Sequence, residues 1–152
     1  MRGVLRVGRA AVAVAAAMVG LSACGFVHAG EAGRSKPNGF VLRGYASVRG
    51  AAPGSAGSLC ESPASAADVR PAATVRVTDP AGHPLATGTL GAGVLAVDSS
   101  AYRCNFPFEI RAVPGGEDRY LIAVADRPAV SFPATQLRQD EPAVIEVGGS
   151  RS

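Results

Sequence analysis

The side chains best suited to chemistry in this 152-residue chain are its three cysteines and two histidines. Cys24, Cys60 and Cys104 have the chemistry of nucleophiles, metal ligands or disulfide partners, and His28 and His83 that of general bases. Their spacing argues against metal binding, because the chain has no Cys-x-x-Cys and no His-x-x-x-His. Neither histidine lies close in sequence to Cys60 or Cys104. A cysteine nucleophile paired with a histidine base is therefore the least supported of the possible cysteine functions.

Other catalytic patterns are missing from the sequence as well. No serine lies in a G-x-S-x-G turn, and the Gly-Ser-Ala-Gly at 54–57 is typical of a flexible loop. No D-x-D-x-D-G calcium loop occurs, and aspartates in turns usually bond their own backbone. The glycines at 88, 91 and 93 do not lie between a strand and a helix, as a dinucleotide site requires. We therefore expect no catalytic site, no metal and no cofactor.

Cys24 follows a basic start and a short apolar run. Arg2, Arg6 and Arg9 precede an uncharged stretch at 10–21, and small residues come next. This order is typical of a secretory signal peptide, predicted here at 1–23. The alternative is an uncleaved membrane helix, for which the run is shorter than the roughly 20 apolar residues required.

The four residues Leu21-Ser22-Ala23-Cys24 resemble the lipobox of bacterial lipoproteins. The resemblance implies cleavage between Ala23 and Cys24, a diacylglyceryl group on the Cys24 sulfur and further acylation of the palmitate type. Two acyl chains anchor a protein stably, whereas one does not. The expected location is the extracytoplasmic face of the cell membrane. An ordinary signal peptide followed by a free or paired Cys24 thiol is the alternative.

Lipidation of Cys24 would leave Cys60 and Cys104 as the only possible internal pair. An exported protein allows a disulfide between them. In the chain-entropy model, closing that loop would stabilise the fold by about 4 kcal/mol. Two buried thiols, or one thiol acting as a nucleophile, are the alternatives.

Removal of the signal peptide changes the charge balance. The formal net charge of +3 is carried by Arg2, Arg6 and Arg9, so the chain beyond residue 23 is neutral. Nucleic-acid binding, which depends on basic patches, is therefore not expected. Lys36 is the only lysine, and the abundance of arginine, alanine, glycine and valine resembles that of high-GC, actinobacterial proteins.

The rest of the chain divides into a tether, a β-domain and a tail. Residues 24–39 are rich in glycine and polar residues and predict a flexible tether of roughly 20 Å, and 149–152 predict a disordered tail. Alternating apolar residues and frequent turns in 40–148 predict one antiparallel β-sandwich of about seven strands. The predicted strands are 40–48, 74–79, 83–93, 104–113, 119–126, 127–132 and 142–148, and 134–141 is the only stretch expected to form a helical turn. Pro107 predicts an edge or a bulge, because proline cannot donate to a strand ladder.

The predicted hairpin at 74–90 resembles the V-x-V-x-D-x-x-G-x-x-L-A-x-G core of transthyretin-like and carboxypeptidase-regulatory-like domains. The matching residues are Val75, Val77, Asp79, Gly82, Leu85, Ala86 and Gly88. A wider frame at 40–147, with a cysteine before the hairpin and C-x-F-x-F-x-I-x-x-V-P after it, resembles small actinobacterial envelope proteins of unknown function. The resemblance implies a transthyretin-like or immunoglobulin-like sandwich and does not specify an activity.

These features together predict a non-catalytic, lipid-anchored envelope protein whose domain contacts another envelope component. The alternative is a carrier lipoprotein that binds a lipid or small molecule inside the sandwich. A large internal cavity would favour the carrier, and a solid core with an exposed apolar patch would favour the interaction module. Tyr45, Tyr102 and Tyr120 are expected to cap the core rather than to form a binding platform.

Overall fold

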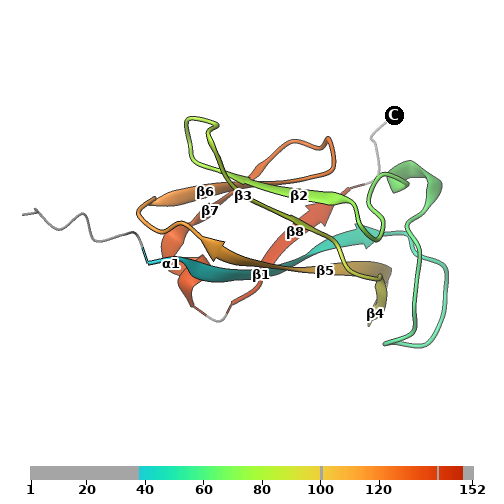
Figure 1. Ribbon diagram of the computed structural model, residues 1–152. Coiled ribbons are helices and arrows are strands. Elements are labelled where there is room, and N and C mark those ends of the chain that lie inside the picture. The colour runs from blue at the N-terminus through green and yellow to red at the C-terminus, as the bar shows by residue number, and fades with distance from the viewer. Residues whose placement is uncertain (1–37, 100, 140, 149–152) are drawn as a thin grey trace, which may run out of the picture. The chain divides into compact units, whose positions relative to one another are not determined.

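The computed structural model describes residues 38–99, 101–139 and 141–148 (Figure 1). The predicted signal peptide, Cys24, most of the predicted tether and the predicted tail lie outside these ranges. No helix among the described residues is long and apolar enough to cross a membrane.

Eight strands and two short helical turns make up the described chain. The strands are β1 (Phe40–Arg49), β2 (Thr74–Thr78), β3 (Pro84–Thr89), β4 (Val94–Asp98), β5 (Ala101–Val113), β6 (Arg119–Val124), β7 (Val130–Pro133) and β8 (Ala143–Val147). A 3₁₀ helix covers Ala64–Ala66, and α1 covers Ala134–Arg138, within the stretch predicted to form a helical turn. The prediction of an all-β fold is confirmed.

The strands form two four-stranded sheets, in the orders β4-β5-β1-β8 and β3-β2-β6-β7. Figure 1 shows them as two layers. The count is eight strands rather than about seven, and the pairing is not purely antiparallel, because β8 runs parallel to β1. The chain between β1 and β8 passes through every strand of the other sheet and returns from β7 by way of α1. A parallel pair needs such a crossover, whereas an antiparallel pair needs only a tight turn.

Period-two alternation places apolar side chains of both sheets in one core. In β2, Val75 and Val77 are fully buried, and in β5 Phe106, Phe108 and Ile110 are at most 5% exposed. These are the faces that the alternation predicts for both strands. The sheets approach closely where β3 meets β5: a Cβ added to Gly88 would lie 2.6 Å from Cγ1 of Ile110. The core between the sheets is therefore filled by interlocking side chains.

Tyr120 anchors the start of β6 inside this core. Its ring is fully buried, and its hydroxyl donates a 2.9 Å hydrogen bond to the carbonyl of Pro114, six residues upstream. A buried tyrosine that bonds back to the chain just before its strand is typical of Greek-key β-sandwiches. The expectation that tyrosines cap the core is confirmed for Tyr120, whereas Tyr102 is 36% exposed.

The stretch before Cys104 forms a hairpin that the sequence analysis did not predict. β4 pairs with the first five residues of β5, from Val94 opposite Asn105 to Asp98 opposite Ala101. Beyond that point β5 stays paired with β1 on one side, but no strand continues the β4 ladder on its other side. The next outward-facing residue there is Pro107, whose carbonyl accepts a hydrogen bond from the amide of Gly91. Proline thus occupies the position where the ladder ends, as an edge residue should.

The β2–β3 hairpin is as predicted. β2 and β3 pair antiparallel from Thr74 opposite Thr89 to Thr78 opposite Pro84. Gly82 has a φ of +90° in the turn, a conformation that glycine adopts without strain.

Candidate functional site

The largest departure from regular structure lies between β1 and β2. Residues 50–73 consist mainly of alanine, glycine, proline and serine, and their regular structure is limited to the 3₁₀ helix. Three apolar side chains of the segment, Ala51, Ala66 and Val69, reach the core. The hydroxyl of Ser62 donates to the carbonyl of Val69 and folds the segment back on itself.

A disulfide between Cys60 and Cys104 fastens this segment to β5. The predicted pairing is confirmed. Cys104 is fully buried within the core, whereas Cys60 is partly exposed. The bond links positions 44 residues apart, so its expected contribution to stability is about 4 kcal/mol.

Next to the disulfide, the segment lines up with β4 and extends its sheet. The amide of Cys60 donates to the carbonyl of Gly93 (3.1 Å), and the amide of Leu95 donates to the carbonyl of Ser58 (2.8 Å). The amide of Gly57 donates to the carbonyl of Leu95 (2.8 Å). Leu59 therefore forms an isolated antiparallel bridge with Val94. We call Ser58–Cys60 the edge segment.

Leu59 is the most unusual side chain of the edge segment. It is 79% exposed, the highest value among the large apolar residues described, and its bridge partner Val94 is 39% exposed. Side chains of a bridge pair without direct hydrogen bonds lie close together on the same face. The two residues thus form an exposed apolar patch on the edge of the sheet.

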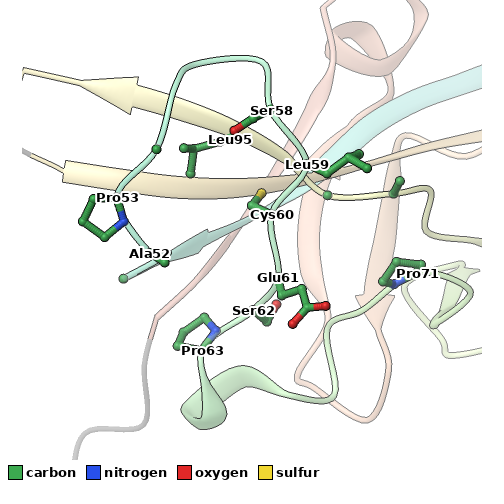
Figure 2. A pocket seen from close by; sticks show the side chains of 14 residues that line it. Ala52, Pro53, Ser58, Leu59, Cys60, Glu61, Ser62, Pro63, Pro71 and Leu95 are labelled. Atoms are coloured by element: carbon green, nitrogen blue, oxygen red, sulfur yellow. The ribbon is translucent and has the colours of Figure 1, made fainter.

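A groove of about 810 Å³ runs along the edge segment and is lined by residues from 50–63, 92–95 and Pro71. In Figure 2, Leu95 lies inside the arch of the loop, and Leu59 and Glu61 point to one side of the returning limb while Cys60 points to the other. A second hollow of about 380 Å³ shares Glu61, Ser62 and Pro71 with the first. The first hollow is lined mostly by small and apolar residues, and the second also has Arg70 and Phe106 in its lining.

Few charged groups accompany this groove. Glu61 is exposed and forms no salt bridge with the described residues. The hydroxyl of Ser58 donates to the carbonyl of Ser55, 2.7 Å away, and that of Ser62 is bonded to Val69. His83 is not among the lining residues. The groove thus offers an apolar surface with one unpaired carboxylate, and its serines have no base beside them.

The polar residues considered for chemistry lie apart, in separate turns. The carboxylate of Asp79 accepts hydrogen bonds from the amide (2.8 Å) and ring nitrogen (2.7 Å) of His83, and the ring bond is the main reason why the pKa of Asp79 is below its ordinary value. His83 is 75% exposed, as expected for a turn residue. Asp98 accepts from the amide of Ser99. Within the described ranges, no group of three His, Cys, Asp or Glu side chains could hold a metal ion.

Of the residues predicted to matter, the structure brings Cys60 and Cys104 together, whereas Ala23 and Cys24 lie outside the described residues. Leu59 was not among the residues predicted to matter. The available signal was that Leu59 is the only leucine between β1 and β2 and directly precedes a cysteine. Comparison with protein-family models, with curated proteins and with solved structures finds no match.

Proposed function

We propose that this chain is an extracytoplasmic lipoprotein whose β-domain is a non-catalytic interaction module of the cell envelope. The proposal combines the signal peptide at 1–23 and the lipobox at Leu21–Cys24 with the Cys60–Cys104 disulfide. Disulfides persist in exported proteins and are rare in the cytosol, so the bond supports export. In this proposal Cys24 carries the diacylglyceryl anchor, and the tether at 24–39 presents the domain to a partner in the envelope.

We assign the domain to the transthyretin-like or immunoglobulin-like class of β-sandwiches. Two four-stranded sheets around one core and the buried Tyr120 hydrogen bond support this assignment. Domains of this class serve many functions, so the class itself does not favour an activity.

The observation that carries the proposed interaction is the exposure of Leu59. Together with its bridge partner Val94, which is 39% exposed, Leu59 at 79% exposure forms a contiguous apolar patch beside a groove. A contiguous exposed patch, unlike a single exposed apolar residue, marks an interaction surface. A carrier would instead need space inside the sandwich. The side chains between the sheets are almost fully buried against one another, and the groove lies at the surface loops. The arrangement favours a protein partner over an internal ligand.

Photo-crosslinking in living cells tests the interaction. A photoreactive amino acid replaces Leu59 in one variant and Val130, which is 37% exposed on β7 of the other sheet, in a matched control. We expect one dominant envelope protein to be captured through position 59 and not through position 130. Capture of lipid through both positions, or of nothing through either, would contradict an interaction module and favour the carrier.

The anchor is tested separately with Cys24→Ala. We expect the parent protein in the membrane fraction to have the mass of a chain that begins at Cys24 plus at least a diacylglyceryl group. The Cys24→Ala variant should lose this mass increment and its membrane attachment. A variant that remains attached after removal of the signal peptide would contradict the lipoprotein assignment.

A further inference from the structure

We propose that the outer side of the edge segment, Ser58–Cys60, binds an extended polypeptide strand of the partner, which carries an apolar residue against Leu59 and a basic residue against Glu61. This inference rests on the proposed function of an interaction module and names the chemistry of its partner. It follows from the backbone geometry at Leu59, the rigidity of the segment, the groove beside it and the charge of Glu61.

The backbone of Leu59 is ready to pair with another strand. The hydrogen bonds on both sides of the Leu59–Val94 bridge use the amide of Cys60 and the carbonyl of Ser58. In an antiparallel pair, the residue between two such bonds directs its own N–H and C=O away from the partner strand. These groups of Leu59 make no hydrogen bond with the described residues. An extended peptide is the ligand that satisfies both groups at once.

The edge segment is held rigidly before any partner arrives. Two cross-strand hydrogen bonds join it to the 93–95 stretch, a third joins the preceding Gly57 to Leu95, and the disulfide at Cys60 fixes its end to the buried Cys104. Binding at a preorganised strand does not incur the entropy cost of ordering a loop. This rigidity distinguishes the edge segment from an ordinary exposed loop.

The side chains around the edge segment favour particular residues in the strand that binds to it. Leu59 and Val94 form the apolar patch against which an apolar side chain of the added strand would pack. Small residues, among them Gly50, Ala52 and Ala92, line the neighbouring groove and leave room for the larger side chains of a partner. Backbone hydrogen bonds give such a complex its affinity, and the side-chain contacts give it specificity.

Glu61 adds a charge preference. Its side chain points to the same side as that of Leu59 (Figure 2), and it is exposed without a salt bridge to the described residues. Side chains on one face of a strand recur every two residues. The added strand is therefore expected to carry its basic residue two positions from its apolar residue. Residues 57–63 contain no basic residue, so the same edge of a second copy would not supply this charge.

Selection from a phage-displayed library of random linear hexapeptides tests the proposal on the full-length protein, purified from membranes in detergent. We expect enrichment of peptides with a basic residue two positions from an apolar residue. Leu59→Ala should weaken binding of a selected peptide by about tenfold, as is typical for an apolar residue at the centre of an interface. Glu61→Arg should reverse the charge preference from basic to acidic residues.

Comparison of Leu59→Pro with Leu59→Ala separates the backbone contribution from that of the side chain, because both remove the leucine side chain and only proline also removes the N–H. This N–H makes no hydrogen bond with the described residues, and proline is tolerated on an edge strand whose N–H faces solvent. We expect loss of peptide binding with an unchanged thermal midpoint and no free thiol. Should this variant fail to fold, the charge reversal by Glu61→Arg decides the question by itself.

Two outcomes would overturn strand binding: no enriched peptides, or enriched peptides whose binding is indifferent to all three substitutions. Crosslinking through position 59 in cells distinguishes this failure from failure of the proposed function. A protein captured there without any peptide selection would leave the interaction module in place and reject the extended strand. If no protein were crosslinked through position 59 and no peptide were selected, both the interaction module and the strand-binding proposal would be rejected.

Discussion

The two sheets and the 50–73 segment are held in place by different means. In the sheets, alternating apolar side chains such as Val75, Val77 and Phe106 are fully buried, and their burial fixes both the register and the facing of each strand. The segment has few large side chains and depends on a disulfide, a handful of hydrogen bonds and a few buried anchors. A long connection with too few large apolar side chains to fix its position by burial can thus be held by a disulfide.

Removal of the disulfide tests this difference and should cause the largest loss of stability among the substitutions considered. Cys60→Ala with Cys104→Ala should lower the free energy of unfolding by about 4 kcal/mol, because the unfolded chain regains the entropy of an open 60–104 loop. Urea unfolding followed by circular dichroism measures the loss. The Cys24→Ala variant is the matched control and should unfold like the parent. Since the sheets retain their buried faces, limited proteolysis of the folded double variant should cut first within 50–73.

An unchanged urea midpoint in the double variant would mean that the segment is held mainly by its noncovalent contacts. If proteolysis of the double variant began outside 50–73, the sheets and the segment would not be held in place by different means. Such cleavage would show that the disulfide stabilises the sheets as much as the connection.

The same contrast explains how much of the fold could be predicted from sequence. Burial alternates along the core strands β2, β6 and β8, and along β5 as far as Ile110, and a period of two indicates a half-buried strand. β4 was not predicted, because the predicted strand at 83–93 ends at Gly93, although the Val94-Leu95-Ala96-Val97 that follows is itself a β-rich run. The parallel pairing of β8 with β1 depends on the path through α1, which no local pattern encodes.

The candidate site was predictable only in part. Counting cysteines predicted the Cys60–Cys104 bond, given a lipidated Cys24. The edge segment could not be predicted, because Leu59 is placed against Val94 by the disulfide and by backbone hydrogen bonds and not by a hydrophobic pattern of its own. Hydrophobic patterns in the sequence thus predict those parts of the molecule whose position is set by the burial of apolar side chains. They do not predict a segment whose position is set by a covalent bond.

Two glycines allow the regions to be compared by the same substitution. A Cβ at Gly44, in the sheet core, would lie 2.4 Å from the carbonyl oxygen of Ala143, and one at Gly93 would lie 2.5 Å from Sγ of Cys104. Both distances require neighbours to move, so Gly44→Ala and Gly93→Ala should each lower the free energy of unfolding by about 1–3 kcal/mol. Gly148→Ala, with no atom within 4 Å of the added Cβ, is the control in denaturant titrations.

The region that becomes sensitive to proteolysis should differ between these two variants. Gly93→Ala should weaken the packing around the disulfide and increase proteolysis within 50–73, whereas Gly44→Ala should not. Equal proteolysis of the segment in both variants would show that the segment and the sheets unfold as one unit.

A smaller effect is expected from Tyr120→Phe. The substitution keeps the buried ring and removes only the 2.9 Å hydrogen bond to the carbonyl of Pro114. Loss of one buried hydrogen bond costs about 1 kcal/mol, which thermal unfolding detects. Tyr102→Phe is the control, since Tyr102 is 36% exposed and its hydroxyl makes no hydrogen bond with the described residues. Equal shifts in the two variants would contradict a specific role for the Tyr120 hydroxyl.

The smallest expected effect concerns the ion pair that joins the 50–73 segment to the turn after β6. Arg127 donates two hydrogen bonds to the carboxylate of Asp68, at 2.7 and 2.6 Å, and these lower the pKa of Asp68 below its ordinary value. Because the folded pKa is the lower one, the pair contributes stability above the ordinary aspartate pKa of about 4 and loses it as the pH falls through the folded value. The Asp68 side chain is 44% exposed, so solvent screening limits the contribution to less than about 1 kcal/mol.

Asp68→Asn should therefore lower the free energy of unfolding slightly at neutral pH, and the difference from the parent should shrink and vanish as the pH falls through the lowered pKa of Asp68. Urea titrations of both proteins across this range measure the difference. Asp126→Asn is a suitable control, because the Asp126 carboxylate is fully exposed and lies 3.8 Å from the nearest arginine nitrogen. A difference that persists at low pH would mean that Asp68 stabilises the segment through its shape and not through its charge. The segment would then depend on packing in the same way as the sheets.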